Sequence, residues 1–579
     1  MLARPLPALK RLARQYGPGL AVRKLALMRQ LARARLPRPA AVLDMHETLC
    51  WLRAYPDDAA VQQQAALMLD GFAQRADLRA HRDALVDSGI AGTSIHYRFF
   101  AAQAQWLARR WPAQLQLDRP AFDEAMDERL ARALPPLLTP TETQALVELK
   151  LPGLAALDRL RDVQTSDAAF LLGRIAAMPG NGFTREAFSD ALDVAYVLAS
   201  APGTPARGSA CVAAAPVVFR QVPPPTARPD LRTELARALR RVRRLPLAQA
   251  EAVVDLARAA MVTRARSLEA FSFADARDVW LVDDGDGLAF ALLGVEPARR
   301  HALATYSGGL TLRNGVPIGY VQADIVGRSA ALSFNTFETF RGGEAAYTFA
   351  RWLAVLRAVF GTTSFSIEPY QLGLHNDEAL DSGAWWFYAK LGFAPRDADT
   401  LRRASAERQR LARHKGQRSS RATLQALAAR HLFFDLDAAQ PYPRIPLGEL
   451  GLAAGAALSA QAGWDRERGV HEAATTLAGA CGATTWRRWP AGQREAWQRM
   501  APWLLLLGAA HWLPAERAAL PALARAKAGR SERDFVAALL AHGRLERALL
   551  EWASQVRSTA GSPVSQPSVL PAPPGLPQR

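Results

Sequence analysis

Residues 278–396 carry the pattern that most restricts the fold of this chain. Two short apolar runs flank the sequence Asp-Gly-Asp-Gly at 284–287, which predicts a β-hairpin. Asn314-Gly315 lies between two further apolar runs and supplies the positive φ values of a tight type I′ turn. Another apolar run follows over 331–340. Together these signals predict a meander of about five consecutive strands.

A helix, a strand and a second helix are expected after the meander. Apolar residues recur at steps of three and four from Glu344 to Phe360, and Gly361 can end that helix in the left-handed conformation. Residues 363–368 alternate apolar side chains with serines, which predicts a half-buried strand. A polar loop over 373–380 then leads into a short helix from Ser382 to Lys390.

The turn that opens the first of these helices is a candidate anion site. It reads Arg341-Gly342-Gly343-Glu344. Backbone N–H groups at a helix N-terminus favour an anion through direct hydrogen bonds and through the helix dipole. Glu344 leaves two alternatives. Either the Glu344 carboxylate occupies the anion site at the helix N-terminus and repels an anionic ligand, or the turn is shifted by one residue and Gly342 and Gly343 form the anion site.

The order of hairpin, strands, glycine turn, helix, strand, loop and helix resembles the GNAT acetyltransferase superfamily. The resemblance covers roughly residues 278–396 and includes Phe-Tyr-Ala-Lys-Leu-Gly-Phe at 387–393. It implies an N-acyltransferase that moves an acetyl or other acyl group from acyl-CoA to an amine. It also implies that the glycine turn clasps the CoA pyrophosphate, and that Tyr388 protonates the departing thiolate. The cofactor-binding residues are then Phe340, Arg341, Gly342, Gly343, Glu344 and Ala346.

Two positions depart from the pattern of that superfamily. The superfamily often has Asn seven residues before the Tyr, where this chain has Asp381. Its turn reads Arg or Gln, two residues, Gly, one residue, then Gly or Ala. Counted from Arg341, the central Gly position holds Glu344, whereas Ala346 fits. Ala384 stands where the superfamily has a small residue.

Further candidate residues surround this motif. Glu338 is expected on one strand face with Leu332, Phe334 and Phe340, where apolar neighbours suit a general base. The alternative is an exposed carboxylate near a strand end. The alternative to a general acid at Tyr388 is a helix residue that only packs on the sheet. The candidates for binding the acceptor are His375, Asn376 and Asp381, although a loop histidine is often only solvated.

Helical periodicity marks most of the remaining chain. The fold class expected is therefore α+β, a GNAT-like mixed sheet with helices, flanked by large α-helical N- and C-terminal regions. Helices are also expected over about 230–243 and 247–265. The predicted boundaries are a basic arm at 1–43, an α-helical domain at 44–200, a linker at 201–229 with one short strand from Val217 to Val222, the GNAT-like domain at 230–397, a helical region at 398–556 and a disordered tail at 557–579.

The basic arm contains ten lysines and arginines and no acid. Such a segment favours weak contact with a polyanion or a membrane surface, and the alternative is a solvated, partly helical arm. The net charge of the chain is +18. Arginine outnumbers lysine roughly tenfold, which we attribute mainly to a GC-rich genome. The overall charge is therefore discounted as a sign of a nucleic-acid partner.

The three cysteines, Cys50, Cys211 and Cys481, lie far apart and have no metal-ligand spacing. We expect a cytoplasmic protein with no signal peptide, no membrane span and no metal. Two functions are compatible with the sequence. The first is acyl-CoA-dependent N-acyltransfer. The second is a catalytically degenerate GNAT-like scaffold whose helical flanks bind a protein or a polyanion.

Overall fold

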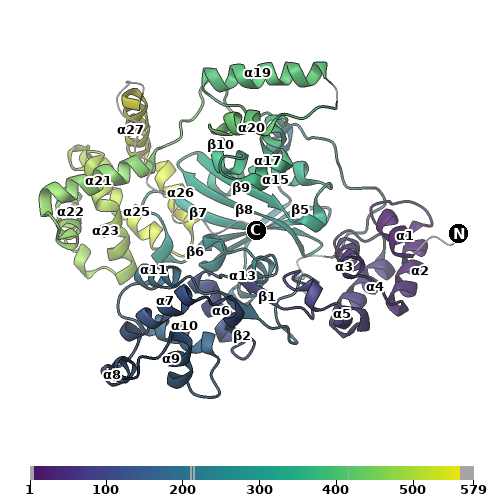
Figure 1. Ribbon diagram of the computed structural model, residues 1–579. Helices are drawn as coiled ribbons and strands as arrows, with labels where there is room; N and C mark the ends of the chain where they lie inside the picture. Colours follow the sequence, from purple (N-terminus) through teal and green to yellow (C-terminus); the bar gives the residue numbers. More distant parts are fainter. Residues whose placement is uncertain (1–4, 209–211, 213–215, 415, 561–579) are drawn as a thin grey trace. The chain divides into compact units, whose positions relative to one another are not determined.

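The computed structural model describes residues 5–208, 212, 216–414 and 416–560 (Figure 1). The chain folds into two compact units. The larger comprises Met1–Ile325, Ala330–Leu436 and Arg530–Glu532, and the smaller comprises Val326–Ser329, Asp437–Gly529 and Arg533–Arg579.

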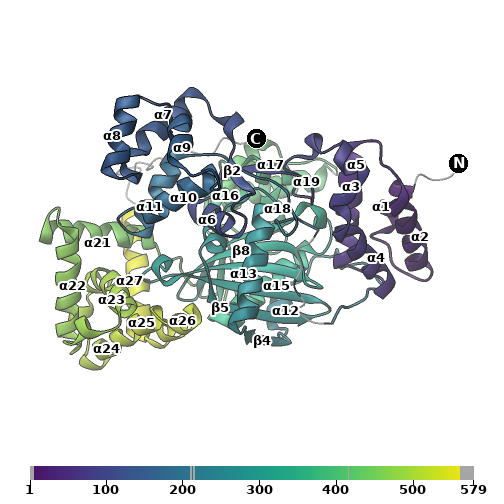
Figure 2. The same cartoon turned by 90° about the horizontal axis from the view of Figure 1, so that it is seen from below.

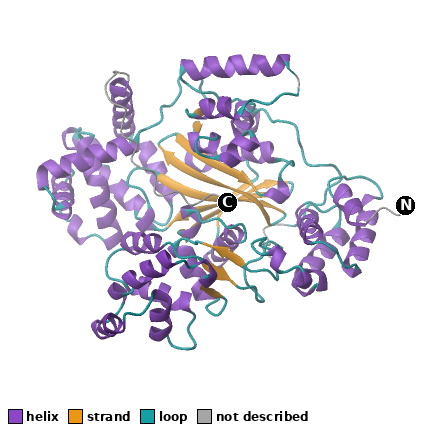
Figure 3. Ribbon diagram, viewed as in Figure 1, coloured by secondary structure: helices purple, strands orange, loops and turns teal. Residues whose placement is uncertain are grey.

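The larger unit is built on an eight-stranded sheet, drawn orange in Figure 3, with the order β11-β10-β9-β8-β7-β6-β5-β4. Its strands are β4 (Arg241–Arg244), β5 (Ala274–Gly285), β6 (Leu288–Val295), β7 (Thr305–Arg313), β8 (Val316–Val326), β9 (Ser329–Thr336), β10 (Ser364–Ile367) and β11 (Leu432–Asp435). Strands β5 to β9 confirm the predicted meander. Asn314 has φ 48° and Gly315 has φ 77°, as the predicted type I′ turn between β7 and β8 requires.

The second half of the sheet is wound through a helix. Helix α15 (Ala345–Phe360) connects the neighbouring strands β9 and β10, which is the crossover that a parallel pair needs. Gly361 ends α15 with φ 72°, as predicted. Strand β11 pairs antiparallel with β10, and Ala394 forms a bridge to Phe433 on its other side.

The two faces of the sheet contact different helices because side chains alternate along each strand. Phe290 of β6 and Thr311 of β7 face α15: the Phe290 ring lies 4.7 Å from the ring of Trp352, and Trp352 donates a 2.7 Å hydrogen bond to Thr311. Their neighbours Ala291 and Leu310 face the opposite way, into a core shared with α13 (Leu247–Val262).

The N-terminal helices complete that second core. They are α1 (Pro5–Leu12), α2 (Leu20–Arg33), α3 (Pro39–Ala54), α4 (Ala59–Asp70) and α5 (Ala76–Ala80), drawn purple in Figure 2. Leu9, Met28 and Leu49 are fully buried in one cluster with Leu310 and Leu312 of the sheet. The basic segment 1–43 is therefore folded over its described residues, and leucines such as Leu9 and Leu31 belong to the core of the larger unit.

Residues 95–198 are not wholly helical, so the prediction for 44–200 is wrong in this part. Three short strands form a separate sheet of order β1-β3-β2: β1 (Ile95–Tyr97), β2 (Leu115–Leu117) and β3 (Tyr196–Leu198). Their helices are α6 (Ala101–Arg110), α7 (Glu124–Ala133), α8 (Pro140–Leu149), α9 (Gly153–Leu160), α10 (Asp167–Ala177) and α11 (Gly182–Leu192).

Two further local predictions are wrong. No strand forms from Val217 to Val222. The helix expected over 230–243 ends early: α12 spans Leu231–Ala236, and Arg241–Arg244 form the edge strand β4. Pairing with β5 determines this strand, because Val242 lies opposite Val282 in the antiparallel register.

One of the remaining helices of the larger unit precedes β5, and the others follow β10. They are α14 (Glu269–Ser272), α16 (Pro369–Leu372), α17 (Asp377–Ser382), α18 (Ala384–Ala389), α19 (Ala398–Arg413) and α20 (Arg421–Ala428). The smaller unit is helical: α21 (Leu447–Ala462), α22 (Arg466–Ala480), α23 (Ala491–Leu506), α24 (Pro514–Ala518), α25 (Leu520–Lys527), α26 (Glu532–Ala541) and α27 (Gly543–Ala560). No helix in the described part of the chain is long and apolar enough to cross a membrane.

Helix α27 extends to Ala560, four residues into the predicted tail. Residues 561–579 of that tail, and Cys211, lie outside the described residues. Of the other two cysteines, Cys50 is buried and Cys481 is half-buried, and both are free thiols.

Candidate functional site

A cavity of about 240 Å³ lies where β9 ends and α15 begins, and helices α16 to α18 close its other side. Its lining combines apolar, amide and charged side chains. The lining residues are Phe334, Asn335, Thr336, Arg341, Ala345, Gln371, Asn376, Glu378, Ala379, Ser382, Ala384, Phe387 and Tyr388. The end of β9 and the first turn of α15 thus share one opening.

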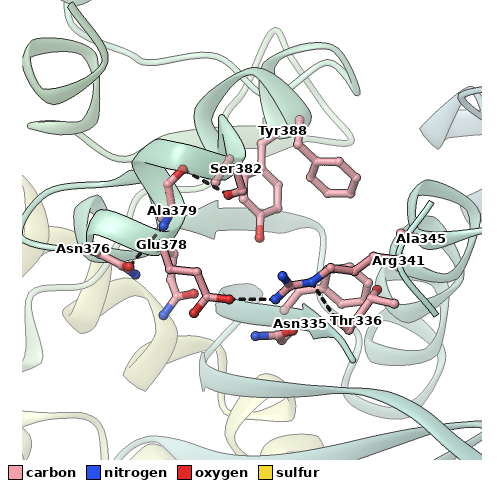
Figure 4. Close-up of a pocket in the computed structure, with 13 residues that line it drawn as sticks. Asn335, Thr336, Arg341, Ala345, Asn376, Glu378, Ala379, Ser382 and Tyr388 are labelled. Carbon is pink, nitrogen blue, oxygen red and sulfur yellow. Dashed lines mark hydrogen bonds and ion pairs between the residues drawn. The ribbon is translucent and has the colours of Figure 1, made fainter. Parts of the chain in front are cut away.

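Tyr388 brings a hydroxyl group into this space. Figure 4 shows its hydroxyl directed into the cavity, above the side chains of Glu378 and Arg341. The ring is held from behind by Phe349, at 5.3 Å between ring centres, and by Phe393, at 6.0 Å. Burial raises the pKa of the Tyr388 hydroxyl, so it stays protonated at neutral pH.

An ion pair joins the two walls of the cavity below Tyr388. Arg341 comes from the turn before α15 and Glu378 from α17, and their side chains form a 2.6 Å contact (Figure 4). Arg266 approaches the same carboxylate at 3.7 Å. Burial raises the pKa of Glu378, but the hydrogen bonds and charges of Arg341 and Arg266 together lower it below its usual value, so the carboxylate is ionised.

Sequence reasoning missed Glu378 and Arg266. Glu378 lies in a segment that was expected to be a loop, and it faces the cavity only because α17 forms there. Arg266 lies in the connection between α13 and α14, and its guanidinium is 5.9 Å from the ring of Tyr320. Tyr320 in turn hydrogen-bonds with the side chain of Asn335, which lines the cavity. No local sequence signal marks this polar group.

Glu344 does not occupy the anion site at the start of α15. Its side chain makes no hydrogen bond to the first turn of that helix. Instead Oε1 accepts hydrogen bonds from Arg313, at 2.8 Å from Nε, and from the Tyr55 hydroxyl at 3.1 Å. Arg220 lies 3.7 Å from Oε2. The first of the two alternatives for Glu344 is therefore wrong: its charge is neutralised away from the helix amides.

The N-terminal helices cover the outer side of the glycine turn. Arg14 donates hydrogen bonds to the carbonyls of Arg341, at 3.0 Å, and Thr339, at 3.2 Å. The guanidinium of Arg14 lies 4.1 Å from the Trp51 ring, and Trp51 stacks with Phe340 at 6.1 Å. Phe340 therefore contacts the N-terminal helices and does not line the cavity.

Glu47 forms a second contact between α3 and the segment that contains the glycine turn. Its carboxylate accepts hydrogen bonds from the Thr339 hydroxyl and contacts Nδ1 of the fully buried His46 at 3.2 Å. Burial raises the pKa of Glu47, but His46, Arg207 and Thr339 together lower it to about 2. Arg14, Trp51 and Glu47 hold the carbonyl side of the turn, and its other side faces the cavity.

The structure brings together some of the predicted site residues. Arg341, Asn376 and Tyr388 line the cavity, and Ala345 lines it in place of the predicted Ala346. Asn376 also caps α17, because its side chain accepts a 3.1 Å hydrogen bond from the Ala379 amide.

Other predicted residues lie away from it. Strand β9 ends at Thr336, so the expectation that Glu338 shares a strand face with Phe334 is wrong; Glu338 is exposed in a short 3-10 helix. His375 is exposed with φ 57°, and Asp381 is exposed and pairs with Arg421 at 2.7 Å. Gly342 and Gly343 form the turn, but neither lines the cavity.

The local structure around Tyr388 also differs from the expected helix. The segment expected to be a loop holds α16 and α17, and Gly383, with φ 69°, separates α17 from α18. The left-handed conformation of Gly383 turns the chain between the two helices. That break lets Ser382 and Ala384 both face the cavity, one at the end of each helix.

No group of three or more histidine, cysteine, aspartate or glutamate side chains is placed to hold a metal ion within the residues that the structure describes. Comparison with protein-family models, with characterised proteins and with solved structures gives no match for this chain.

Proposed function

We propose that this chain is an acyl-CoA-dependent N-acyltransferase of the GNAT type. One observation carries the proposal: the protonated hydroxyl of Tyr388 projects into a cavity whose wall includes the first turn of α15. A helix N-terminus favours a pyrophosphate, and a buried acid beside it suits a departing thiolate. Strands β5 to β9, the glycine turn, α15, β10 and helices α17–α18 follow the order on which the resemblance rests.

The proposed chemistry is transfer of an acyl group from sulfur to nitrogen. The neutral amine attacks the thioester carbon, a C–N bond forms, and the C–S bond breaks. The thiolate takes the Tyr388 proton, the amine nitrogen releases a proton to water, and that proton returns to Tyr388 through solvent. Asn335 and Asn376 line the same space and can hydrogen-bond the amide groups of a pantetheine arm.

Arg341 is the proposed ligand of the CoA pyrophosphate. Its guanidinium is half exposed at the cavity, in ion contact with Glu378. A phosphate can replace that carboxylate because a guanidinium binds either group with the same paired geometry. The proposal therefore requires the Arg341–Glu378 contact to open when CoA binds.

Calorimetric titration of the folded protein with acetyl-CoA and with free CoA tests the proposal. We expect micromolar binding of both, weakened at least about tenfold by Arg341→Ala. Lys390→Ala is a matched control, because that cation is also exposed, on the segment after α18, and does not line the cavity. Absence of heat with either ligand would contradict the proposal.

A catalytically inactive scaffold is the second candidate. The cover of Trp51 and Arg14 over the turn favours it. The helical flanks would then bind a protein or a polyanion. Under this alternative, CoA does not bind, while the exposed arginines of α2 contribute to partner binding. Point variants are the appropriate probe, since deleting residues 1–43 removes buried leucines from the core.

A further inference from the structure

Helix α19 is packed on the rest of the larger unit by only one narrow side. Of its 16 residues, Thr400, Ala404 and Glu407 are buried. Figure 1 shows α19 above α20, at the edge of this unit. Helix α19 is therefore of marginal stability by itself, because of its length, and it gains little from packing, because most of its surface is polar.

The segment that contains α19 is strongly cationic. Residues 398–421 hold eight lysines and arginines and two acids, a net charge of +6 in 24 residues, whereas the whole chain carries +18 in 579. The charge density is thus about eight times the average of the chain. A general arginine bias does not account for such a local excess.

Most of these arginines lack an acidic partner. Arg410 pairs with Glu407 at 2.7 Å, and Arg402 contacts Asp399. Within the described residues, four side chains of the segment have no hydrogen-bond or ion-pair partner: Arg403, Arg408, Arg413 and Arg418. With about 100° of rotation per residue, Arg413 falls on the side of α19 opposite the buried Ala404, and Arg403 lies about 80° around the helix from Arg413; both are exposed.

The composition of this face selects among possible partners. The exposed residues around the arginines of α19 are Leu401, Ser405, Ala406, Gln409 and Ala412, and Leu401, which is 40% exposed, is the one large apolar side chain among them. A protein interface needs an apolar or aromatic centre that this face does not offer. An interfacial membrane helix needs an apolar side to insert, and the less polar side of α19 packs on the protein. A phosphodiester backbone needs neither an apolar centre nor an apolar side on the helix, because guanidinium groups bind it by charge and paired hydrogen bonds.

The cationic segment is fastened to the wall of the cavity. Arg421 at the start of α20 forms ion pairs with Asp377 and Asp381 of α17, the latter at 2.7 Å. Ser419 accepts a 2.9 Å hydrogen bond from Trp386 of α18. We infer that residues 398–421 form a nucleic-acid-binding surface that contacts the phosphate backbone next to the cavity. This inference does not depend on the proposed acyl transfer.

The test is fluorescence anisotropy with a labelled single-stranded oligouridine of about 20 nucleotides, in the absence of CoA. Four free guanidinium groups predict that the logarithm of the association constant falls with the logarithm of salt concentration with a slope of about −3. The variant Arg403→Glu/Arg413→Glu should bind at least about tenfold more weakly, with a slope about 1.5 smaller in magnitude.

The matched control is Arg82→Glu/Arg159→Glu, two arginines outside both α2 and α19 that are also exposed. It changes the net charge equally and should leave the affinity within about twofold. Circular dichroism verifies that both variants are folded; if the charge reversal unfolds α19, Arg403→Gln/Arg413→Gln should still weaken binding several-fold. Unchanged affinity of the α19 variants, an equal loss in the control, or binding to anionic lipid vesicles but not to RNA would overturn the inference.

Discussion

Nε of Arg313 donates a 2.8 Å hydrogen bond to Oε1 of Glu344, and neither side chain is more than 2% exposed. This contact links the end of β7 to the start of α15. It directs the one carboxylate of the glycine turn away from the helix amides, so the turn can still accept an anion. Burial lowers the pKa of Arg313, but the charges of Glu344, Tyr55 and Asp286 and the hydrogen bond to Glu344 together raise it above its usual value, so the guanidinium stays charged.

Glu344→Leu should therefore destabilise the larger unit by about 3 kcal/mol, because it leaves a buried guanidinium without its main counter-ion. The free energy of unfolding in urea measures the effect. Replacing both partners, in Arg313→Met/Glu344→Leu, should recover most of the loss. Equal stability of Glu344→Leu and the wild type would show that the pair is not buried as described.

Tyr388→Phe should lower turnover by about ten- to a thousandfold and leave the affinity for CoA within about twofold. The variant removes the proton donor for the thiolate and keeps the ring that packs on Phe349. Release of free CoA thiol in the presence of an amine acceptor measures turnover, and calorimetry measures affinity. Phe387→Leu, next to it on the cavity wall, serves as a packing control. Unchanged turnover in Tyr388→Phe would remove this hydroxyl from the mechanism.

Glu378→Gln should tighten CoA binding about two- to fivefold, which corresponds to the modest strength of an exposed ion pair. The substitution frees Arg341 from its 2.6 Å contact before the ligand arrives. The gain should shrink as salt concentration rises, because salt screens the exposed ion pair. Asp381→Asn controls for the loss of one exposed carboxylate on the same helix. Weaker CoA binding by Glu378→Gln would instead make Glu378 a direct ligand.

Glu47 should make stability depend on acidity. Its pKa is about 2 in the folded chain and 4.5 for the free group, so the unfolded state binds the proton more tightly. The stabilisation is present above pH 4.5 and is lost as the pH falls toward 2. Between about pH 5 and about pH 3 the wild type should lose about 2 kcal/mol more than Glu47→Gln in urea titrations. Parallel pH profiles for the two proteins would contradict this role.

The strands and turns of the meander could be predicted because their signals are local. Asn314-Gly315 and Gly361 determine the direction of the chain through positive φ values that few other residues adopt. Strand β4 carried no such signal. Its sequence, Arg-Val-Arg-Arg, has a single apolar residue, and its conformation comes from pairing with β5.

The candidate site likewise contains residues that a local signal predicts and residues whose positions depend on distant parts of the chain. Tyr388 lies in a contiguous motif and could be predicted to face a cavity. The direction of the Glu344 side chain depends on Arg313 and Tyr55, and that of the turn depends on Arg14 and Trp51. These contacts span up to 327 residues, so no window of sequence contains both partners. The predicted position of Glu338 is wrong for a local reason, because β9 ends at Thr336, two residues before it.

The core shared by the N-terminal helices and the sheet has a consequence for synthesis of the chain. Tyr55 and Glu344 are 289 residues apart, so at ribosomal speed Tyr55 leaves the tunnel about 15 to 60 seconds before its partner exists. Throughout that interval, the apolar sides of α1 to α4 have no sheet to cover them. Nascent chains of this protein should therefore engage chaperones from an early stage, and release only after β7 and α15 have emerged.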